Sequence, residues 1–155
     1  MRLRRAVWHE VIPGLWQGGS RTSPEPARFD VVVSLCARGN RRAPLPPGQR
    51  CLTWFIADAA VPDEETIRRV ARQVSAWLDE GQRVLVRCQA GLNRSGLVVA
   101  RTLVERGFQP AEAIQLIRHR RHRRALNNQA FVAWLLKEGA GTRETAPAPS
   151  ADPQP

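Results

Sequence analysis

The fold follows from one stretch of this 155-residue chain, Val84-Leu85-Val86-Arg87-Cys88-Gln89-Ala90-Gly91-Leu92-Asn93-Arg94-Ser95-Gly96. Its first residues are mostly apolar and β-branched, which predicts a buried strand that leads into Cys88. A short loop centred on Gly91 follows, and the apolar residues from Leu97 onward recur at helical spacing. The Cys88 thiol is therefore expected at the mouth of a helix, where backbone N–H groups and the helix dipole favour a thiolate or a phosphate.

Strand-like and helix-like segments alternate along the rest of the chain. Strands are predicted within residues 11–19, with a turn at Pro13-Gly14, and at residues 29–36, 51–56 and 84–86. Helices are predicted between residues 63 and 80 and at residues 95–105, 110–118 and 128–136. This alternation indicates an α/β fold with a central, mostly parallel sheet flanked by helices.

The domain boundary is predicted from composition. Residues 1–138 form the expected folded domain, and residues 139–155 are a Pro/Ala-rich tail that we expect to be disordered. No apolar run is long enough to cross a membrane, and arginines follow Met1 where a signal peptide would have an apolar segment. These features predict a cytoplasmic protein that does not bind membranes.

Cysteine content and charge narrow the chemistry. The three cysteines are too few and too scattered for a disulfide framework or a metal site, and Cys36 and Cys51 are expected to be small buried side chains in strands. The net charge of +10 indicates anionic partners. The arginines of the chain are spread along the sequence except for a cluster over residues 118–124, which we interpret as a solvated helix end. Phosphate groups are therefore favoured over nucleic acid as the anionic partner.

Five residues separate Cys88 from Arg94, and Ser95 follows directly. In this spacing the loop resembles the Cys-x-x-x-x-x-Arg-Ser/Thr signature of the cysteine-dependent protein tyrosine phosphatases. The pattern after the loop is most similar to the compact dual-specificity branch, and the resemblance spans residues 11–136. It implies hydrolysis of a phosphorylated protein or another phosphate monoester, with no metal or organic cofactor.

The spacing of the loop has a physical reason. Five residues allow the chain to fold around a tetrahedral anion with successive N–H groups pointing inward, and Arg94 adds a planar two-pronged donor. The thiolate of Cys88 then lies in line for attack on phosphorus. The expected phosphate-binding residues are Gln89, Ala90, Gly91, Leu92, Asn93 and Arg94.

The resemblance also implies the roles of two further side chains. Asp58, thirty residues before Cys88, occupies the place of the family's general acid and base. Asp63 is the rival acid, but its position before Glu64-Glu65 predicts a helix cap instead. The Ser95 hydroxyl is expected to hydrogen-bond the Cys88 sulfur and to ease departure of the thiolate, with a helix N-cap as the alternative interpretation.

One residue departs from the family pattern. Arg87 stands where the resembled family usually has a histidine before the cysteine. Adjacent side chains of a strand point to opposite faces, so residue 87 is expected to act from behind the loop without touching substrate. Arg87 keeps a positive charge at this position but changes the network of side chains behind the loop.

The sequence thus predicts a protein phosphatase that hydrolyses phosphotyrosine, with phosphoserine and phosphothreonine as further substrates, through a phosphocysteine on Cys88. Residues 92–96 also resemble the loop of cysteine-type RNA triphosphatases, which leaves an RNA 5′-phosphatase open, although those relatives do not depend on an acid at the position of Asp58. A phosphate-binding module disabled by Arg87 is the non-enzymatic alternative. A rhodanese-like sulfurtransferase ranks last because it has less use for Asp58 or Ser95.

Overall fold

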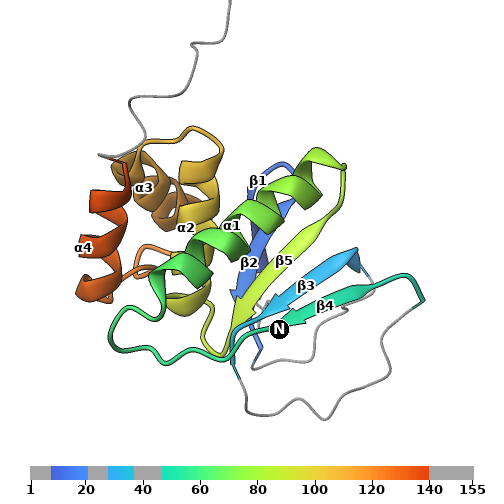
Figure 1. The fold of residues 1–155 in the computed structure, drawn as a ribbon, viewed down its shortest axis with the longest axis horizontal. Helices are drawn as coiled ribbons and strands as arrows, with labels where there is room; N and C mark the ends of the chain where they lie inside the picture. The colour runs from blue at the N-terminus through green and yellow to red at the C-terminus, as the bar shows by residue number, and fades with distance from the viewer. Residues whose placement is uncertain (1–7, 21–27, 37–46, 140–155) are drawn as a thin grey trace, which may run out of the picture.

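The computed structural model describes residues 8–20, 28–36 and 47–139. The strands are β1 (Trp8–Ile12), β2 (Leu15–Gly19), β3 (Val31–Ser34), β4 (Arg50–Thr53) and β5 (Val84–Cys88). The helices are α1 (Glu64–Asp79), α2 (Arg94–Glu105), α3 (Pro110–Arg120) and α4 (Gln129–Glu138). Figure 1 shows α1 lying across the sheet, with α2, α3 and α4 grouped beside it.

The five described strands form one sheet in the order β1-β2-β5-β3-β4. The pair β1 and β2 is antiparallel, whereas β5 is parallel to both of its neighbours and β3 is parallel to β4. The predicted α/β fold with a mostly parallel sheet is therefore confirmed. The middle position of β5 places its carboxyl end, and the loop that follows, at the centre of one edge of the sheet.

The strand β5 is buried on both faces. Val84, Val86 and Cys88 belong to the large core that the helices cover, whereas Leu85 packs with Val32 in a smaller cluster on the opposite face. Two tryptophans, Trp8 and Trp16, pack against this second cluster together with Phe29. Burial on two faces explains why β5 has an almost continuous apolar sequence without polar alternation.

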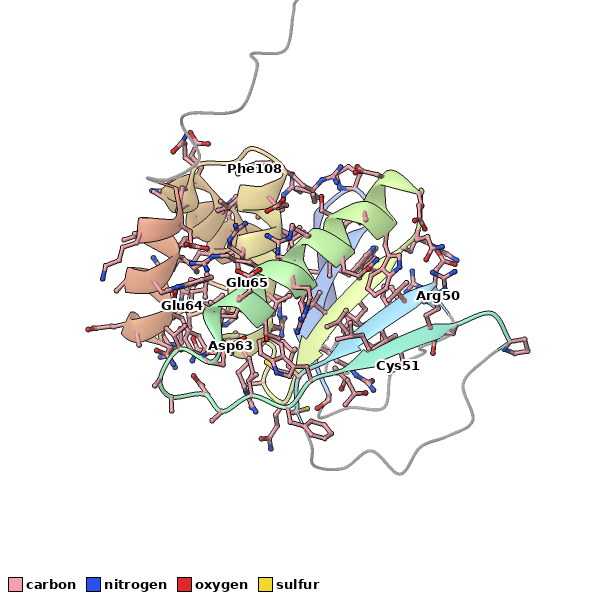
Figure 2. The ribbon with its side chains drawn as sticks, viewed as in Figure 1. Arg50, Cys51, Asp63, Glu64, Glu65 and Phe108 are labelled. Carbon is pink, nitrogen blue, oxygen red and sulfur yellow. The ribbon has the colours of Figure 1, made fainter. Side chains whose placement is uncertain are left out.

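The helix α1 begins where the sequence predicts. The Asp63 carboxylate accepts the Thr66 backbone N–H at 3.0 Å and caps the helix, so the prediction that Asp63 is a cap is confirmed. Figure 2 shows Asp63, Glu64 and Glu65 together at this end of α1. The Thr66 hydrogen bonds hold the pKa of Asp63 below its ordinary value.

Two predictions along the chain are corrected. The strand predicted at residues 51–56 is shorter, because β4 ends at Thr53 and an irregular segment leads from there to α1. Cys51 was expected to be buried, but it is exposed, because β4 is the edge strand of the sheet (Figure 2). Cys36 is buried as predicted.

Other expectations fall outside the described residues. They include most of the loop predicted between the third and fourth strands and the tail beyond Gly139. None of the helices in the described ranges has the length and apolar character needed to span a membrane.

Candidate active site

The Cys88 thiol lies at the bottom of the loop that joins β5 to α2. Its side chain is almost fully buried, at 1% exposure. The Gly91 backbone N–H donates to Cys88 Sγ at 3.2 Å, and Ser95 Oγ lies 3.4 Å from the same sulfur. Asn93 occupies the N-cap of α2, so the cap interpretation of Ser95 is wrong and its hydroxyl faces the thiol.

The loop can pass over β2 only because Gly91 has no side chain. Its backbone has a φ of +74°, in the left-handed region that L-residues rarely adopt. A Cβ at this position would lie 2.4 Å from the Gly18 carbonyl carbon and 2.5 Å from the Gly19 nitrogen. The glycine is therefore required both by conformation and by the close approach of two backbones.

The outward face of the loop is held by the guanidinium of Arg121. Its Nε donates to the Gly91 carbonyl at 3.0 Å and its Nη2 donates to the Ala90 carbonyl at 3.3 Å. The amide of Gln17, which is fully buried, donates to the Gly91 carbonyl at 3.3 Å and to Ser95 Oγ at 3.2 Å. In a trans peptide the N–H points away from the carbonyl, so these bonds turn the N–H groups of Gly91 and Leu92 inward.

Arg121 is also electrostatically linked to the thiol. Burial lowers the pKa of Arg121, and Coulomb attraction to the nearby Cys88 side chain opposes that shift. Its Nη1 lies 3.0 Å from His9 Nδ1, and burial followed by the charges of Arg121 and His122 holds the pKa of His9 below its ordinary value of 6.5. The Arg118 guanidinium donates to the carbonyls of Ala125 and Leu126, in the turn that follows α3. The arginine cluster is thus only partly a solvated helix end.

Arg94, the first residue of α2, is half-buried beside the segment that carries Asp58. Its Nη1 donates to the Ile56 carbonyl at 3.4 Å. The remaining N–H groups have no partner among the described residues, so they are free to bind an anion over the loop.

The structure places Asp58 beside residues 89–94, the predicted phosphate-binding residues, which we call the phosphate loop. Asn93 Nδ2 donates to Asp58 Oδ2 at 3.0 Å, and Asn128 Nδ2 donates to Asp58 Oδ1 at 2.9 Å. The carboxylate is thus attached both to the loop itself and to the start of α4. Asp63, the rival acid, is occupied by its capping bonds at the start of α1.

Arg87 lies on the face of β5 opposite to Cys88, as strand alternation requires. Its Nε is buried and has no hydrogen-bond partner within the described part of the chain. Ser34, its register partner on β3, likewise has a buried and unpartnered Oγ. The cation that touches the phosphate loop from outside is therefore Arg121, and Arg87 is turned away from it.

Sequence reasoning missed two residues that support the loop. Gln17 had a detectable signal, because it is a polar residue inside an otherwise apolar strand whose neighbour is β5. Arg121 had none, since it stands among several arginines and only the fold shows which of them turns inward.

A buried thiol below inward-pointing N–H groups and a guanidinium suits nucleophilic attack on a bound phosphate ester. This is the chemistry of the cysteine-dependent phosphatases. Residues 32–139 match the family model described as dual specificity phosphatase, catalytic domain, and the chain belongs to this family.

Similar proteins agree with this assignment. The mouse protein tyrosine phosphatase type IVA 3 is 34% identical over 105 residues, which cover 66% of this chain and 60% of the relative. The human RNA/RNP complex-1-interacting phosphatase is 35% identical over 77 residues, which cover 46% of this chain and 23% of that protein. The crystal structure of human DUSP28 has the same fold, with a TM-score of 0.73 and 24% identity over 85% of this chain and 95% of that one.

Proposed function

We propose that this protein hydrolyses phosphotyrosine, with phosphoserine and phosphothreonine as further substrates, through a phosphocysteine on Cys88. In the first step the Cys88 thiolate forms a bond to phosphorus as the bond from phosphorus to the ester oxygen breaks. The inward N–H groups of residues 89–94 and the Arg94 guanidinium hold the other phosphate oxygens. Asp58 gives its proton to the departing oxygen.

The second step releases phosphate. Asp58, now a carboxylate, takes a proton from water, and the resulting nucleophile attacks the phosphorus of the phosphocysteine. The phosphorus–sulfur bond breaks and the electron pair returns to the Cys88 sulfur. Ser95 Oγ, at 3.4 Å from that sulfur, donates a hydrogen bond to the departing thiolate.

The observation that carries this proposal is the 3.0 Å bond between Asp58 and Asn93, a residue of the phosphate loop. It supports an acid held next to the position where the leaving oxygen would lie. A sulfurtransferase or a purely phosphate-binding module has no chemical need for a carboxylate at this place.

The test compares wild type, Cys88→Ser, Asp58→Asn and Asp63→Asn on phenyl phosphate and on 4-nitrophenyl phosphate. Cys88→Ser should abolish turnover on both esters. Asp58→Asn should lower kcat on phenyl phosphate by about 10²–10³-fold, the usual contribution of a general acid, and by less on the ester whose phenol leaves easily. Asp63→Asn is the matched control and should not change the ratio of the two rates.

Three outcomes contradict the proposal. Steady turnover by Cys88→Ser would exclude the phosphocysteine, and an equal loss on both esters in Asp58→Asn would remove that residue as the acid. Tight vanadate binding by a wild type without turnover at any pH would identify a binding module.

An RNA 5′-phosphatase is the second candidate, because of the net charge of +10 and the similarity to the human RNA/RNP complex-1-interacting phosphatase. The position of Asp58 supports the protein phosphatase instead. Phosphate release from a phosphotyrosyl peptide and from a 5′-triphosphorylated RNA separates the two, and we expect the higher kcat/KM on the peptide.

A further inference from the structure

The Asp58 carboxylate is held from two sides, and its role as the acid rests on the function proposed above. Asp58 is exposed and belongs to the irregular segment between β4 and α1, a kind of segment that by itself does not fix a side chain. Yet both carboxylate oxygens have an amide donor, one from Asn93 and one from Asn128. These two residues, the asparagine pair, come from different elements and meet at a single carboxylate.

The backbone sets which way each amide of the asparagine pair points. Asn128 Oδ1 accepts the N–H groups of Ala130 and Phe131 at 3.1 and 3.3 Å as the N-cap of α4, so its NH₂ group must face Asp58. Asn93 Oδ1 accepts the Asn128 backbone N–H at 3.0 Å, so its NH₂ group also faces the acid.

The second hydrogen of each NH₂ group is used as well. Asn93 Nδ2 donates to Asn127 Oδ1 at 2.9 Å, and Asn128 Nδ2 donates to the Ala59 carbonyl at 2.9 Å. Every strong donor and acceptor of the two side chains thus has an assigned partner, apart from spare lone pairs. A fully bonded network of this kind has one geometry and resists rotation.

The turn that carries Asn128 is itself fixed against the phosphate loop. Leu126 is fully buried and has a φ of +57°, which is unfavourable for a leucine, and its N–H donates to the Leu92 carbonyl at 3.1 Å. The packing that holds Leu126 in this conformation also sets the distance between Asn128 and the loop. The acid and the phosphate loop are therefore attached to one rigid unit.

We propose that the asparagine pair positions the Asp58 carboxyl for proton transfer, through one amide from the phosphate loop and one from the N-cap of α4. Capping alone does not account for Asn128, because serine or aspartate caps a helix equally well without an NH₂ group. The NH₂ group of Asn128 donates to the Asp58 carboxylate and to the Ala59 carbonyl. Asn93 and Asn128 act through Asp58, so they are positioning residues.

The test uses substitutions that keep the cap and remove the donor. Asn128→Ser retains an oxygen for the α4 N–H groups but cannot reach Asp58, and Asn128→Asp retains the cap and places a second carboxylate against the acid. The matched control is Asp63→Ser, which makes a similar cap substitution at α1, away from Asp58. Each variant is assayed on phenyl phosphate and on 4-nitrophenyl phosphate, with its Tm measured alongside.

We expect Asn128→Ser to lower kcat on phenyl phosphate by about tenfold, less than the loss of the acid itself, and to lower it less on 4-nitrophenyl phosphate. KM and Tm should change little, and Asn128→Asp should show the larger loss. In an Asp58→Asn background, Asn128→Ser should cause no further fall in kcat, because its effect passes through the missing acid. The control should keep the wild-type ratio of rates.

An equal fall on both esters, or an additive effect in the Asp58→Asn background, would mean that Asn128 only stabilises the fold, and the inference would be wrong. If Asp58→Asn shows the leaving-group-dependent loss and Asn128→Ser does not, the inference fails while the proposed function stands. If Asp58→Asn itself shows no such loss, the assignment of the acid is wrong and this inference falls with it.

Discussion

One guanidinium, that of Arg121, binds two consecutive carbonyls of the phosphate loop at 3.0 and 3.3 Å. Arg87, the cation next to the nucleophile in sequence, is directed to the other face of the sheet and leaves its Nε unpartnered within the described residues. The loop geometry therefore depends on Arg121, a residue that lies 33 positions after Cys88 in the chain. Among the described residues, no hydrogen bond joins the side chain of the adjacent Arg87 to the loop.

We expect Arg121→Met to lower kcat/KM on an aryl phosphate by about 10- to 100-fold, because a hydrogen bond to a charged group contributes about 1.5–3 kcal/mol. Without the guanidinium the Ala90 carbonyl loses its side-chain donor and the Gly91 carbonyl keeps only that of Gln17, so the inward N–H groups are held less firmly. Steady-state kinetics and the inhibition constant of vanadate measure the effect. The matched control is Arg120→Met, since Arg120 is exposed and has no bonded partner in the described part of the chain. Equal losses in the two variants would mean that net charge, and not loop geometry, is responsible.

The sequence was sufficient for residues whose role follows from near neighbours in the chain. Cys88, Gly91 and Arg94 lie within seven residues, and their strand, loop and helix can be recognised from local pattern alone. Arg121 and Gln17 could not be found in this way, because their contacts with the loop depend on chain segments that only tertiary packing brings together. Asn128 begins the last predicted helix, but its bond to Asp58 spans 70 residues and cannot be found from local pattern.

Three helices of the fold meet at one half-buried carboxylate, that of Glu138 at the end of α4. Arg68 of α1 donates to it at 2.7 and 3.0 Å, and Arg101 of α2 donates at 2.9 Å. Burial raises the pKa of Glu138, but the hydrogen bonds from the two guanidinium groups outweigh burial and bring the pKa below its ordinary value of 4.5. These contacts fix α4, and with it the cap residue Asn128, relative to α1 and α2.

We expect Glu138→Gln to lower the free energy of unfolding by about 1.5–3 kcal/mol near neutral pH, because it removes the carboxylate that Arg68 and Arg101 share and leaves these arginines only Glu64, Glu65 and Glu105 as ion-pair partners. Because the pKa of Glu138 is lower in the folded protein than in the unfolded chain, the unfolded chain binds the proton first as pH falls. The stabilisation is complete above pH 4.5 and is lost as pH falls through the native pKa. The difference between wild type and Glu138→Gln should therefore shrink in acid. Denaturant unfolding at several pH values measures this difference. The control is Glu64→Gln, which removes an exposed ion-pair partner of Arg68 and should change the free energy of unfolding by less than about 0.5 kcal/mol. A difference that stays constant in acid would contradict the assignment.

Element ends were less predictable than element types, and β4 shows why. The apolar run at residues 51–56 predicts a long strand, but β4 ends at Thr53. The Trp54 N–H still donates to the Ser34 carbonyl at 3.0 Å. The chain then turns toward the phosphate loop, where the Ile56 carbonyl accepts a hydrogen bond from Arg94. The strand is cut short by contacts that carry Asp58 to the site, and these contacts are not local in sequence.

On the scale of the whole molecule, the chain that carries the proposed phosphate site has a net charge of +10. Arg120 at the end of α3, and Arg123 and Arg124 in the turn that follows, lie exposed without an acidic partner among the described residues. A positive field of this kind raises the rate at which anionic substrates reach the site, and salt screens it with a Debye length of about 10 Å at 0.1 M.

We therefore expect kcat/KM on a phosphotyrosyl peptide with acidic flanks to fall by about tenfold between roughly 0.02 and 0.5 M salt, while kcat changes little. The same peptide with neutral flanks is the control and should show a smaller slope, because only its phosphate feels the field. Charge removal in an Arg123→Gln, Arg124→Gln double variant should reduce the slope for the acidic peptide without changing kcat, since both side chains are exposed and neither has a hydrogen bond to the loop among the described residues. A slope that is the same for both peptides would mean that salt acts on phosphate binding by Arg94 alone, and that the surface arginines do not guide the substrate.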